Sequence, residues 1–560
     1  MKKNYLFFVA LLFQVLVNLS LGQTPTFEWN IQYNAYTEPW VIKEDYQKNI
    51  LVAGLFMTTV DFDPGLNQSQ LSSPTDKSIF IQKLDSLGNL IWVKYLDNRI
   101  DSVSFFSYSE NYMVDLISDN EGNIYFSSSF TGNVDFDPSG GVSHLSNFQD
   151  SLSPHIQDDI FICKYSSNGE FIWVKRIDLG HNNDRRIKLF LDDYNHVYLV
   201  GDFGYGTSDL DPNNNNTFLI KLDSSGSQVY SNLFPIYNGA GIYDFPDPNC
   251  FVDKDGSFLL SGNIFGQNSQ VIDIDPSSLI LNVSASGLID GIFAKYDSTG
   301  HLVWHKQLRA SGLSQCKIGN LVKSDDGNIY IYGSLSGTVD FDPSDQNYDV
   351  SSPEEAYFFA KYSSSGDLVW VKIYIIRDNT DFELVQSRTL NNGGVIFSFT
   401  PDDPCTINTG IGNVTYTSSN DYYGLLLIFD SNGDYQWSKQ YHQDNRDLSI
   451  FDLYVNSEDD IFFSGVFEGT VNFDPANNAA PLVCQSCSTL LPNGFGYGHD
   501  VFLVKYKFSG TSGIEELQAK PKSLIKIVDL MGRETTIKPN VVLFYQYSDG
   551  SVEKKIVIVD

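Results

Sequence analysis

Positive charge is scarce in this sequence, in which 36 Lys and Arg residues stand against 69 Asp and Glu and give a formal net charge of −33. Nucleic acid is therefore not an expected partner, because phosphate contacts need a basic surface. The same charge argues against adhesion to anionic lipid. Methionine is rare as well, with 4 residues against 32 Tyr and 40 Phe, and this aromatic bias favours β-sheets over helices.

Long apolar runs are also lacking, apart from one near the N-terminus at residues 6–17, and that run is too short to span a bilayer. Two lysines precede it and a small-x-small cleavage site follows at residues 20–22. We therefore predict that residues 1–22 are a secretory signal peptide. No Cys stands at the cleavage junction, so a lipid anchor is not expected. The mature protein is expected to be exported, soluble and without a membrane span.

Six cysteines are too few to make a chain of 560 residues a disulfide scaffold. Cys163 lies in an apolar run and is expected to be a buried thiol that packs as a small hydrophobic side chain. Cys484 and Cys487 form a C-x-x-C motif in a predicted loop. A local disulfide, two free thiols and a metal site that includes His499 remain alternatives for this pair.

Familiar catalytic motifs are missing: the sequence has no His-Glu-x-x-His, no Gly-x-Ser-x-Gly and no phosphate-binding loop. The arginines are few and show no pattern along the chain, and the pair Arg185-Arg186 is expected in a solvated turn. The glycine-rich run 494–498 is typical of a flexible loop rather than of a nucleotide site. We predict that the protein is not an enzyme and has no catalytic residue.

One pattern recurs along nearly the whole chain, and its best copy covers residues 326–372. It reads Asp-Gly-Asn, an apolar strand, Gly-Thr-Val-Asp-Phe-Asp-Pro, a polar loop, an apolar strand ending in Ala-Lys-Tyr, Ser-Ser-Ser-Gly, and a strand with Trp370. The two glycine turns join antiparallel strands, so each copy predicts four strands. The Asp-Pro landmark falls at Pro64, Pro138, Pro212, Pro276, Pro343 and Pro475.

The landmarks are 74, 74, 64, 67 and 132 residues apart, and since the last step is twice 66, one landmark is missing near residues 401–404. Short strands repeated at long, regular spacing are the signature of a propeller. The predicted fold class is all-β, a seven-bladed β-propeller of four-stranded antiparallel blades over residues 23–509. A linker at 510–522 and a small C-terminal β tail at 523–560 are expected to follow.

The last copy of the repeat has no Trp, whereas Trp29 stands in a strand without a partner at the mature N-terminus. We predict that this strand pairs beside the one that carries Phe502, completes the seventh blade and closes the ring, which leaves no free edge there. The aromatic residues of the fourth strands are expected to pack between blades. They are Trp29, Trp92, Trp173, Tyr230, Trp304, Trp370 and Trp437.

Units such as Lys295-Tyr296-Asp297-Ser298-Thr299-Gly300, with Trp304 after them, resemble the β-propeller repeats of large secreted bacterial proteins (SBBP-like repeats). They are similar, less closely, to the Asp-box of sialidases and to the tryptophan-docking repeat of quinoprotein dehydrogenases. In all three families the motif is architectural: the turn fixes a hairpin and the aromatic side chain packs between blades. The resemblance therefore implies a fold and not an activity.

The end of the chain, with Asp-x-x-Gly-Arg-Glu at 529–534 and Tyr-x-x-Gly-x-x-x-Lys-Lys at 547–555, resembles a C-terminal sorting domain of the type IX secretion system. The usual upstream Pro-Asn-Pro half is absent, so the segment 523–560 looks truncated. The resemblance implies contact with the secretion machinery and delivery to the surface of a Gram-negative bacterium. The alternative is a small β appendage without this role.

The Asp-x-Asp-Pro motif opens all but one of the loops between the second and third strands. In an extended segment alternate side chains point the same way, so both carboxylates face one side and the middle residue points inward. Such oxygens are able to hold calcium, whereas Asp before Pro also caps turns by accepting backbone N–H groups, and both interpretations remain open. The pairs are Asp61 and Asp63, Asp135 and Asp137, Asp209 and Asp211, Asp273 and Asp275, Asp340 and Asp342, and Asn472 and Asp474.

Antiparallel strands bring these loops, together with the connections between blades, to one face, and loops on rigid scaffolds carry function. We therefore expect a secreted or cell-surface monomer that acts as a binding, adhesion or scaffold module for an extracellular protein or glycan. Calcium is the only cofactor that these motifs suggest. The alternative is a secreted propeller-type hydrolase or lyase that acts on glycans.

Overall fold

The structure is a computed structural model in which the chain forms two compact units, residues 1–509 and 510–560. Every described secondary-structure element is a strand, so the fold class is all-β. No helix in the described part of the chain is long and apolar enough to cross a membrane. The described residues are 24–33, 37–65, 67–73, 78–96, 115–130, 133–146, 159–177, 187–202, 217–234, 249–266, 271–277, 279–344, 346–374, 384–401, 404–408, 412–416, 422–441, 447–474, 481–487, 498–508, 524–528, 533, 535, 542–547 and 552–556.

Apart from five short two-stranded hairpins, the described strands of the first unit form seven sets of four antiparallel strands, five as separate sheets and two joined in one eight-stranded sheet. Within each set we name the strands A to D in hydrogen-bonded order. Set 1 is β2 (Thr37–Glu44), β3 (Ile50–Phe56), β6 (Ser78–Leu84) and β7 (Leu90–Leu96); set 2 is β8 (Asp115–Ser118), β9 (Ile124–Phe130), β12 (Asp159–Tyr165) and β13 (Phe171–Ile177); set 3 is β14 (Ile187–Leu191), β15 (Val197–Asp202), β16 (Thr217–Leu222) and β17 (Gln228–Phe234); set 4 is β18 (Cys250–Val252), β19 (Phe258–Phe265), β22 (Ile289–Tyr296) and β23 (Leu302–Ala310).

The remaining sets follow the same order, except that the fourth strand of the last one comes from the N-terminus. Set 5 is β24 (Gln315–Lys323), β25 (Ile329–Asp340), β26 (Asp349–Tyr362) and β27 (Leu368–Tyr374); set 6 is β28 (Leu384–Thr389), β29 (Val395–Phe399), β32 (Gly424–Phe429) and β33 (Tyr435–Tyr441); set 7 is β34 (Leu448–Val455), β35 (Asp460–Phe467), β38 (Asp500–Lys507) and β1 (Thr26–Tyr33).

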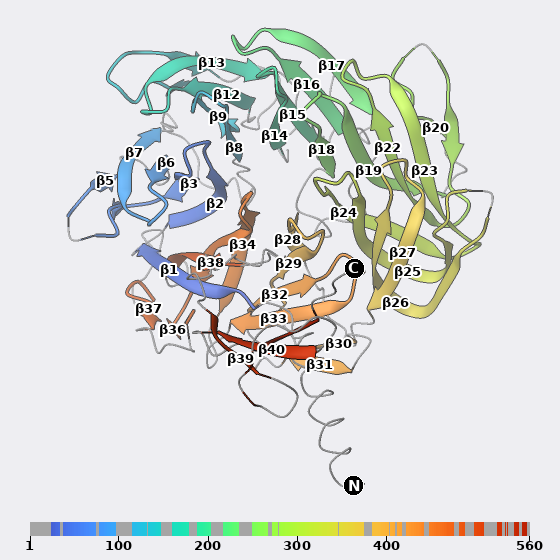
Figure 1. Ribbon diagram of the computed structural model, residues 1–560. Coiled ribbons are helices and arrows are strands. Elements are labelled where there is room, and N and C mark those ends of the chain that lie inside the picture. The colour runs from blue at the N-terminus through green and yellow to red at the C-terminus, as the bar shows by residue number, and fades with distance from the viewer. Residues whose placement is uncertain are drawn as a thin grey trace. The chain divides into compact units, whose positions relative to one another are not determined.

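The sets follow one another around a common centre, as Figure 1 shows from blue β2 through green β19 to orange β34. Each strand A contacts the strand A of the next set, and β34 contacts β2, so these contacts form a closed circle. Seven clusters of buried apolar side chains accompany them, and each cluster combines residues of two consecutive sets. The hydrophobic core therefore lies between the sets.

The N-terminal strand completes the last set. β1 pairs antiparallel with β38, with Gln32 opposite Phe502 and Tyr33 opposite Val501. The predicted pairing of the Trp29 strand with the strand that carries Phe502 is confirmed. Gln32 of β1 also donates a side-chain hydrogen bond of 2.6 Å to Asp500, which lies 468 residues further along the chain. The two ends of the unit are therefore bonded directly to each other.

An ion pair recurs in five of the sets and joins a Lys of strand C to an Asp in the turn between strands A and B or, in set 7, at the start of strand B. Lys83 Nζ lies 2.8 Å from Asp45 Oδ2, and Lys505 Nζ lies 2.8 Å from Asp460 Oδ2. Further pairs join Lys164 to Asp119 at 3.5 Å, Lys221 to Asp192 at 3.4 Å and Lys295 to Asp253 at 3.8 Å. The Lys of the Ala-Lys-Tyr pattern is thus part of the framework of each of these sets.

The second unit contains one described sheet of three antiparallel strands, in the order β39, β40, β41. Their bounds are β39 (Leu524–Val528), β40 (Val542–Tyr547) and β41 (Val552–Ile556). The predicted signal peptide at 1–22 and the linker at 510–522 lie outside the described residues.

Candidate functional site: the hairpins of the Asp-x-Asp-Pro motif

Short β-hairpins are inserted between strands B and C, where the sequence predicted only a polar loop after Asp-x-Asp-Pro. That prediction was wrong, because the residues after the motif return as a second strand. The hairpins pair β4 (Thr59–Asp61) with β5 (Gln70–Ser72), β10 (Asn133–Asp135) with β11 (His144–Ser146), β20 (Val271–Asp273) with β21 (Asn282–Ser284), β30 (Cys405–Asn408) with β31 (Asn413–Tyr416), and β36 (Thr470–Val471) with β37 (Leu482–Val483). In set 5 the hairpin strands continue from β25 and into β26, with Asp340 opposite Asp349.

The first Asp of the motif joins the two sides of the hairpin loop. Asp61 Oδ1 accepts hydrogen bonds from the backbone N of Asp63 at 3.1 Å and of Ser69 at 2.8 Å. Asp340 Oδ1 does the same with Asp342 at 3.0 Å and Tyr348 at 2.8 Å. The same two bonds recur at Asp135, from Asp137 and Ser143, and at Asp273, from Asp275 and Leu281.

The second Asp caps the turn across the proline. Asp63 Oδ1 accepts from the backbone N of Gly65 at 2.8 Å, and Asp342 Oδ1 accepts from that of Ser344 at 2.9 Å. Asp137 and Asp275 accept in the same way from Ser139 and Ser277. One carboxylate oxygen of each Asp is therefore occupied by backbone donors, as in an Asx turn.

In set 7 an asparagine, Asn472, stands at the position of the first Asp. Asn472 Oδ1 accepts from the backbone N of Asp474 at 2.9 Å, so a neutral amide replaces the first carboxylate. Among the described residues, no group of three or more His, Cys, Asp or Glu side chains is placed to hold a metal ion. Asp209 and Asp211 lie outside the described residues, as do all of residues 203–216.

The middle residue of the motif anchors the hairpin to the core. Phe62, Phe136, Ile274 and Phe341 are fully buried and Phe473 nearly so. Their backbone carbonyls accept hydrogen bonds from strand C, from Gln82 Nε2 in set 1 and from the phenols of Tyr165, Tyr296, Tyr362 and Tyr506 in sets 2, 4, 5 and 7. This tie was missed at the sequence level, although the Tyr of the recurring Lys-Tyr pair was its visible signal.

The tips of the hairpins differ from one another and reach solvent. Val142 is 75% exposed, Leu279 and Ile280 are 70% and 76% exposed, and Tyr348 is 52% exposed. The anchors are thus repeated from set to set, whereas the exposed side chains are not.

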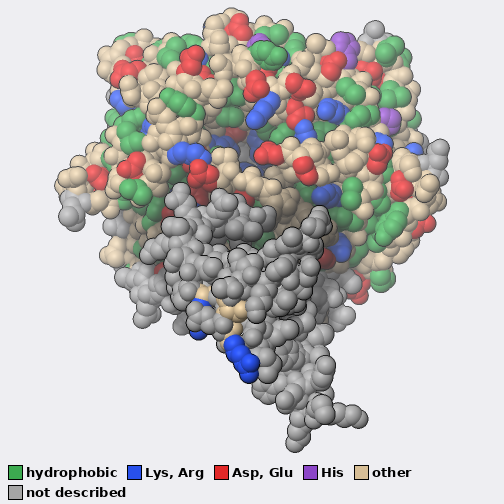
Figure 2. Space-filling view, in the orientation of Figure 1, with side chains coloured by type: hydrophobic (Ala, Val, Ile, Leu, Met, Phe, Trp, Pro, Cys, Tyr) green, Lys and Arg blue, Asp and Glu red, His purple; other side chains and the backbone are tan. Residues whose placement is uncertain are grey.

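Some of the strands A carry charged side chains that bond to residues of the neighbouring sets. Asp115 Oδ2 accepts from the backbone N of Leu189 at 2.7 Å, and its Oδ1 lies 3.7 Å from Lys43 Nζ. Asp452 repeats the arrangement, with Ile42 N at 2.8 Å and Arg388 Nη2 at 3.7 Å. Figure 2 shows acidic and basic side chains around a hollow in the middle of the visible face.

The aromatic side chains of strand D reach from one set to the next. The Nε1 atoms of Trp29, Trp92, Trp173 and Trp370 donate hydrogen bonds to carbonyls in the turn between strands C and D of the following set, namely Ser86, Ser167, Ser224 and Ser431. Tyr230 and Trp304 lie beside Gly300 and Gly366 of the corresponding turns, and Trp437 packs against the cluster between sets 6 and 7.

Cys484 and Cys487 form a disulfide with a Cα–Cα distance of 5.7 Å. Cys163, by contrast, is a free thiol with no exposed surface. Burial raises the pKa of the Cys163 thiol well above its usual value, which keeps it in the unreactive protonated form.

No protein-family model and no curated protein sequence matches the chain significantly. Among solved structures, the chain is similar to a polysaccharide lyase of family PL25, an ulvan lyase, with a TM-score of 0.42 and 10% identity over 78% of this chain and 93% of that one. A protein of unknown function from Dyadobacter fermentans gives 0.32 and 9% over 70% and 94%. An acylaminoacyl peptidase from Pyrococcus horikoshii gives 0.29 and 11% over 78% and 58%. At these TM-scores the likenesses carry no argument about function.

Proposed function

We propose that residues 23–509 form a seven-bladed β-propeller that acts as a secreted or cell-surface binding, adhesion or scaffold module, with the inserted hairpins as its binding face. The observation that supports this proposal is the contrast between the hairpin anchors and the hairpin tips. The anchors repeat the same bonds, from the Asp carboxylates to backbone N–H groups and from strand C to the carbonyl of the buried middle residue. Variable side chains on a rigid, repeated support are typical of binding surfaces.

The ligand belongs to the class of extracellular proteins or glycans. The tips offer apolar and aromatic surface, at Val142, Leu279, Ile280 and Tyr348, rather than a cluster of charges. Such side chains contact a partner by burial of apolar area and, for Tyr348, by stacking. The proposed role does not depend on calcium, and turn capping alone accounts for one carboxylate oxygen of both aspartates in each described Asp-x-Asp pair.

A direct test uses purified residues 23–509, fluorescently labelled, on a glycan array and on fixed bacterial cells. The variant Leu279→Ser with Ile280→Ser should lose binding, and a variant with Tyr348→Ser should lose part of it. Leu87→Ser is the matched control, since Leu87 is 74% exposed but lies in a turn between strands C and D, at the opposite end of the strands. Equal loss in the control, or binding unaffected by the tip variants, would refute the hairpin face. Consumption of a bound glycan would instead establish the hydrolase or lyase alternative.

We further propose that residues 1–22 direct export and that residues 523–560 direct delivery to the surface of a Gram-negative cell by the type IX machinery. The support is the separation of residues 510–560 as a compact unit of its own. A strain that produces residues 1–512 should retain folded protein in the periplasm. Surface exposure of this truncated protein at the level of the full chain would show that the tail has another role.

A further inference from the structure

A side-chain clamp joins strands C and D at the base of the hairpin of set 4. Gln307 of strand D donates hydrogen bonds from Nε2 to the carbonyl of Ser284 at 2.8 Å and to Asp290 Oδ2 at 2.7 Å. Ser284 ends the hairpin strand β21, and Asp290 stands near the start of strand C. The Asp290 carboxylate also accepts from the backbone N of Ser286 at 2.8 Å and of Gly287 at 3.1 Å. These donors compensate the carboxylate for the loss of water, because Asp290 is fully buried.

Set 7 contains the same clamp, but its strand D comes from the other end of the chain. Gln32 Nε2 of β1 donates to the carbonyl of Val483 at 2.8 Å and to Asp500 Oδ2 at 2.6 Å. Asp500, which is fully buried as well, accepts from the backbone N of Gln485 at 2.7 Å and of Ser486 at 3.1 Å. The glutamine, the end of the hairpin, the aspartate and the two backbone donors thus occupy equivalent places in both sets.

The two clamps differ in how the backbone donors are held in place. In set 4 the donors lie four and three residues before Asp290, so a short loop fixes them. In set 7 they lie 15 and 14 residues before Asp500, and a connection of that length fixes them less. The disulfide between Cys484 and Cys487 encloses these two donor residues and no others. The disulfide therefore supplies in set 7 the constraint that the short loop supplies in set 4.

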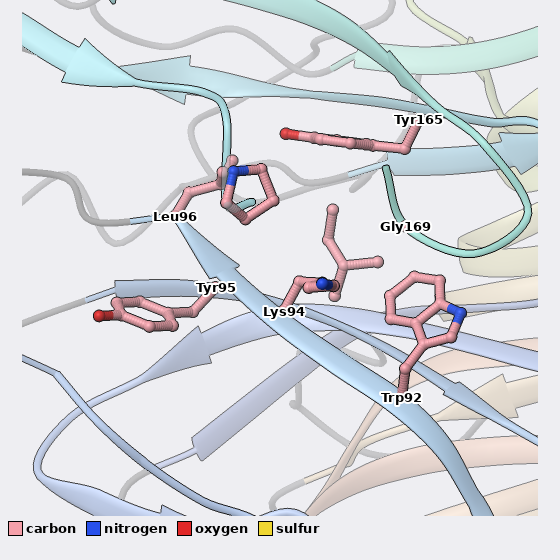
Figure 3. A pocket seen from close by; sticks show the side chains of 8 residues that line it. Trp92, Lys94, Tyr95, Leu96, Tyr165 and Gly169 are labelled. Carbon is pink, nitrogen blue, oxygen red and sulfur yellow. The ribbon is translucent and has the colours of Figure 1, made fainter. Parts of the chain in front are cut away.

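The clamp matters more in set 7, because its strand D does not follow strand C in the chain. In set 1 a turn connects β6 to β7, and Trp92 and Lys94 of β7 lie beside Gly169 of set 2, as Figure 3 shows. β1 makes the corresponding contact with set 1 through Trp29, but it begins the unit, whereas β38 ends it. The place of β1 in set 7 therefore depends on strand pairing and on side-chain bonds such as those of Gln32.

We propose that the Cys484–Cys487 disulfide is a redox-sensitive latch for the N-terminal strand. In the oxidised form it holds the two backbone donors on Asp500, and the fixed carboxylate holds Gln32 and with it β1. In the reduced form the donors leave the carboxylate more often, and β1 separates more readily from β38. Both cysteines are partly exposed, so a reductant reaches them.

Opening of the latch requires a dithiol reductant. The dithiol transfers two electrons and two protons to the disulfide, so the S–S bond breaks, Cys484 and Cys487 become thiols, and the dithiol itself becomes a disulfide. Cys484 stays anchored, because its backbone N donates to the carbonyl of Gly469 at 2.7 Å, whereas Cys487 loses its covalent tether. The latch is therefore open where thiols are kept reduced and closed in an oxidising compartment.

Hydrogen exchange of the backbone amides of β1 measures the latch in purified residues 23–560. Dithiothreitol without denaturant should lower the protection of β1 about tenfold, as expected when hydrogen bonds to a charged group are weakened. Protection of β23, the strand D of set 4, is the internal control and should not change. The double substitution Cys484→Ser and Cys487→Ser should show the reduced behaviour with or without dithiothreitol. Unchanged protection of β1 on reduction, or equal losses in β1 and β23, would overturn the proposal.

A second comparison separates a latch from a disulfide that only stabilises the fold. Gln32→Ala should lower the protection of β1 about tenfold in the oxidised protein, but less than about twofold when Cys484→Ser and Cys487→Ser are also present, because the clamp is then already released. Gln307→Ala is the matched control, and its effect on β23 should be the same in both backgrounds. An effect of Gln32→Ala on β1 that is equally large in both backgrounds would refute the coupling between the disulfide and the strand.

Discussion

The indole nitrogen of Trp29 donates a hydrogen bond of 3.4 Å to the carbonyl oxygen of Ser86. Trp29 belongs to β1, the only strand that set 7 takes from the N-terminus, and Ser86 lies in the turn between β6 and β7 of set 1. A Cβ atom placed on Gly88 of the same turn would lie 3.6 Å from the indole ring and 3.3 Å from Ile31. The contact between the last and first sets therefore depends on the N-terminal strand.

Deletion of residues 23–31 should open this junction. The deletion removes Trp29 and the buried Ile31, and loss of one such aliphatic side chain alone costs about 2–5 kcal/mol. It also exposes the hydrogen-bonding edge of β38, which favours aggregation. We expect a clearly lower melting temperature and multimers on size-exclusion chromatography. Deletion of residues 513–560 is the control and should leave the melting temperature unchanged, and an unchanged, monomeric 23–31 deletion would disprove ring closure.

Asp340 should act through its oxygen acceptor and not through its charge. Asp340→Ala leaves the backbone N–H groups of Asp342 and Tyr348 without their acceptor and should cost about 1–2 kcal/mol in urea unfolding. Asp340→Asn keeps an acceptor, as Asn472 does in set 7, and should cost less than about 0.5 kcal/mol.

The melting temperature is accordingly expected to respond neither to calcium nor to EDTA. A bound cation would contribute about 2.7 kcal/mol per site at a hundredfold excess over Kd. A calcium-dependent rise that the double substitution Asp340→Asn and Asp342→Asn abolishes would contradict turn capping and would establish the cation site.

The ion pair of Asp45 and Lys83 should make stability depend on pH. Burial alone would raise the pKa of Asp45, but hydrogen bonds from Lys83 and Asn49 outweigh it and hold the pKa below its usual value. Asp45→Asn leaves the Lys83 ammonium buried without its counter-charge and should cost about 3 kcal/mol at pH 7.

A group with a lowered pKa in the folded state contributes its full stability above its unfolded pKa of about 3.9 and loses it as the pH falls through the lower folded value. The difference between the parent protein and Asp45→Asn in urea unfolding should therefore shrink below about pH 4. Adding Lys83→Met to Asp45→Asn should recover part of the loss. A difference that stays constant down to pH 2 would show that the ion pair does not cause it.

A comparison of Gly433 with Gly140 separates the cost of backbone strain from the cost of a steric clash. Its φ is +75°, and a Cβ atom there would lie 2.7 Å from the Trp370 ring. Gly140 has a φ of +91° with nothing within 4 Å of an added Cβ atom. Gly140→Ala should thus cost about 1 kcal/mol for the left-handed conformation alone, and Gly433→Ala about 3 kcal/mol, as measured by urea unfolding. Equal costs would mean that the indole moves aside without penalty.

The strand pattern of this chain was largely predictable because its signals are local. The glycines of the turns between strands C and D, at Gly169 and Gly366 for example, adopt positive φ and stand at the expected positions. The return strands of the hairpins were not predictable, since three residues such as 144–146 carry no periodicity of their own. The pairing of β11 depends on its partner strand β10 and on the buried Phe136 that follows β10.

The sequence by itself determined the order of strands and turns and the N-terminal strand that completes the last set, because a turn is encoded within a few neighbouring residues and Trp29 stood outside any complete copy of the repeat. Only the tertiary structure decided which groups meet across the sets. The Asp115 carboxylate of set 2 accepts from the backbone N of Leu189 in set 3, and the Asp452 carboxylate of set 7 accepts from the backbone N of Ile42 in set 1. Residues far apart in the chain become neighbours only when the sets pack around one centre. A pattern within a few neighbouring residues does not show which distant residues will meet.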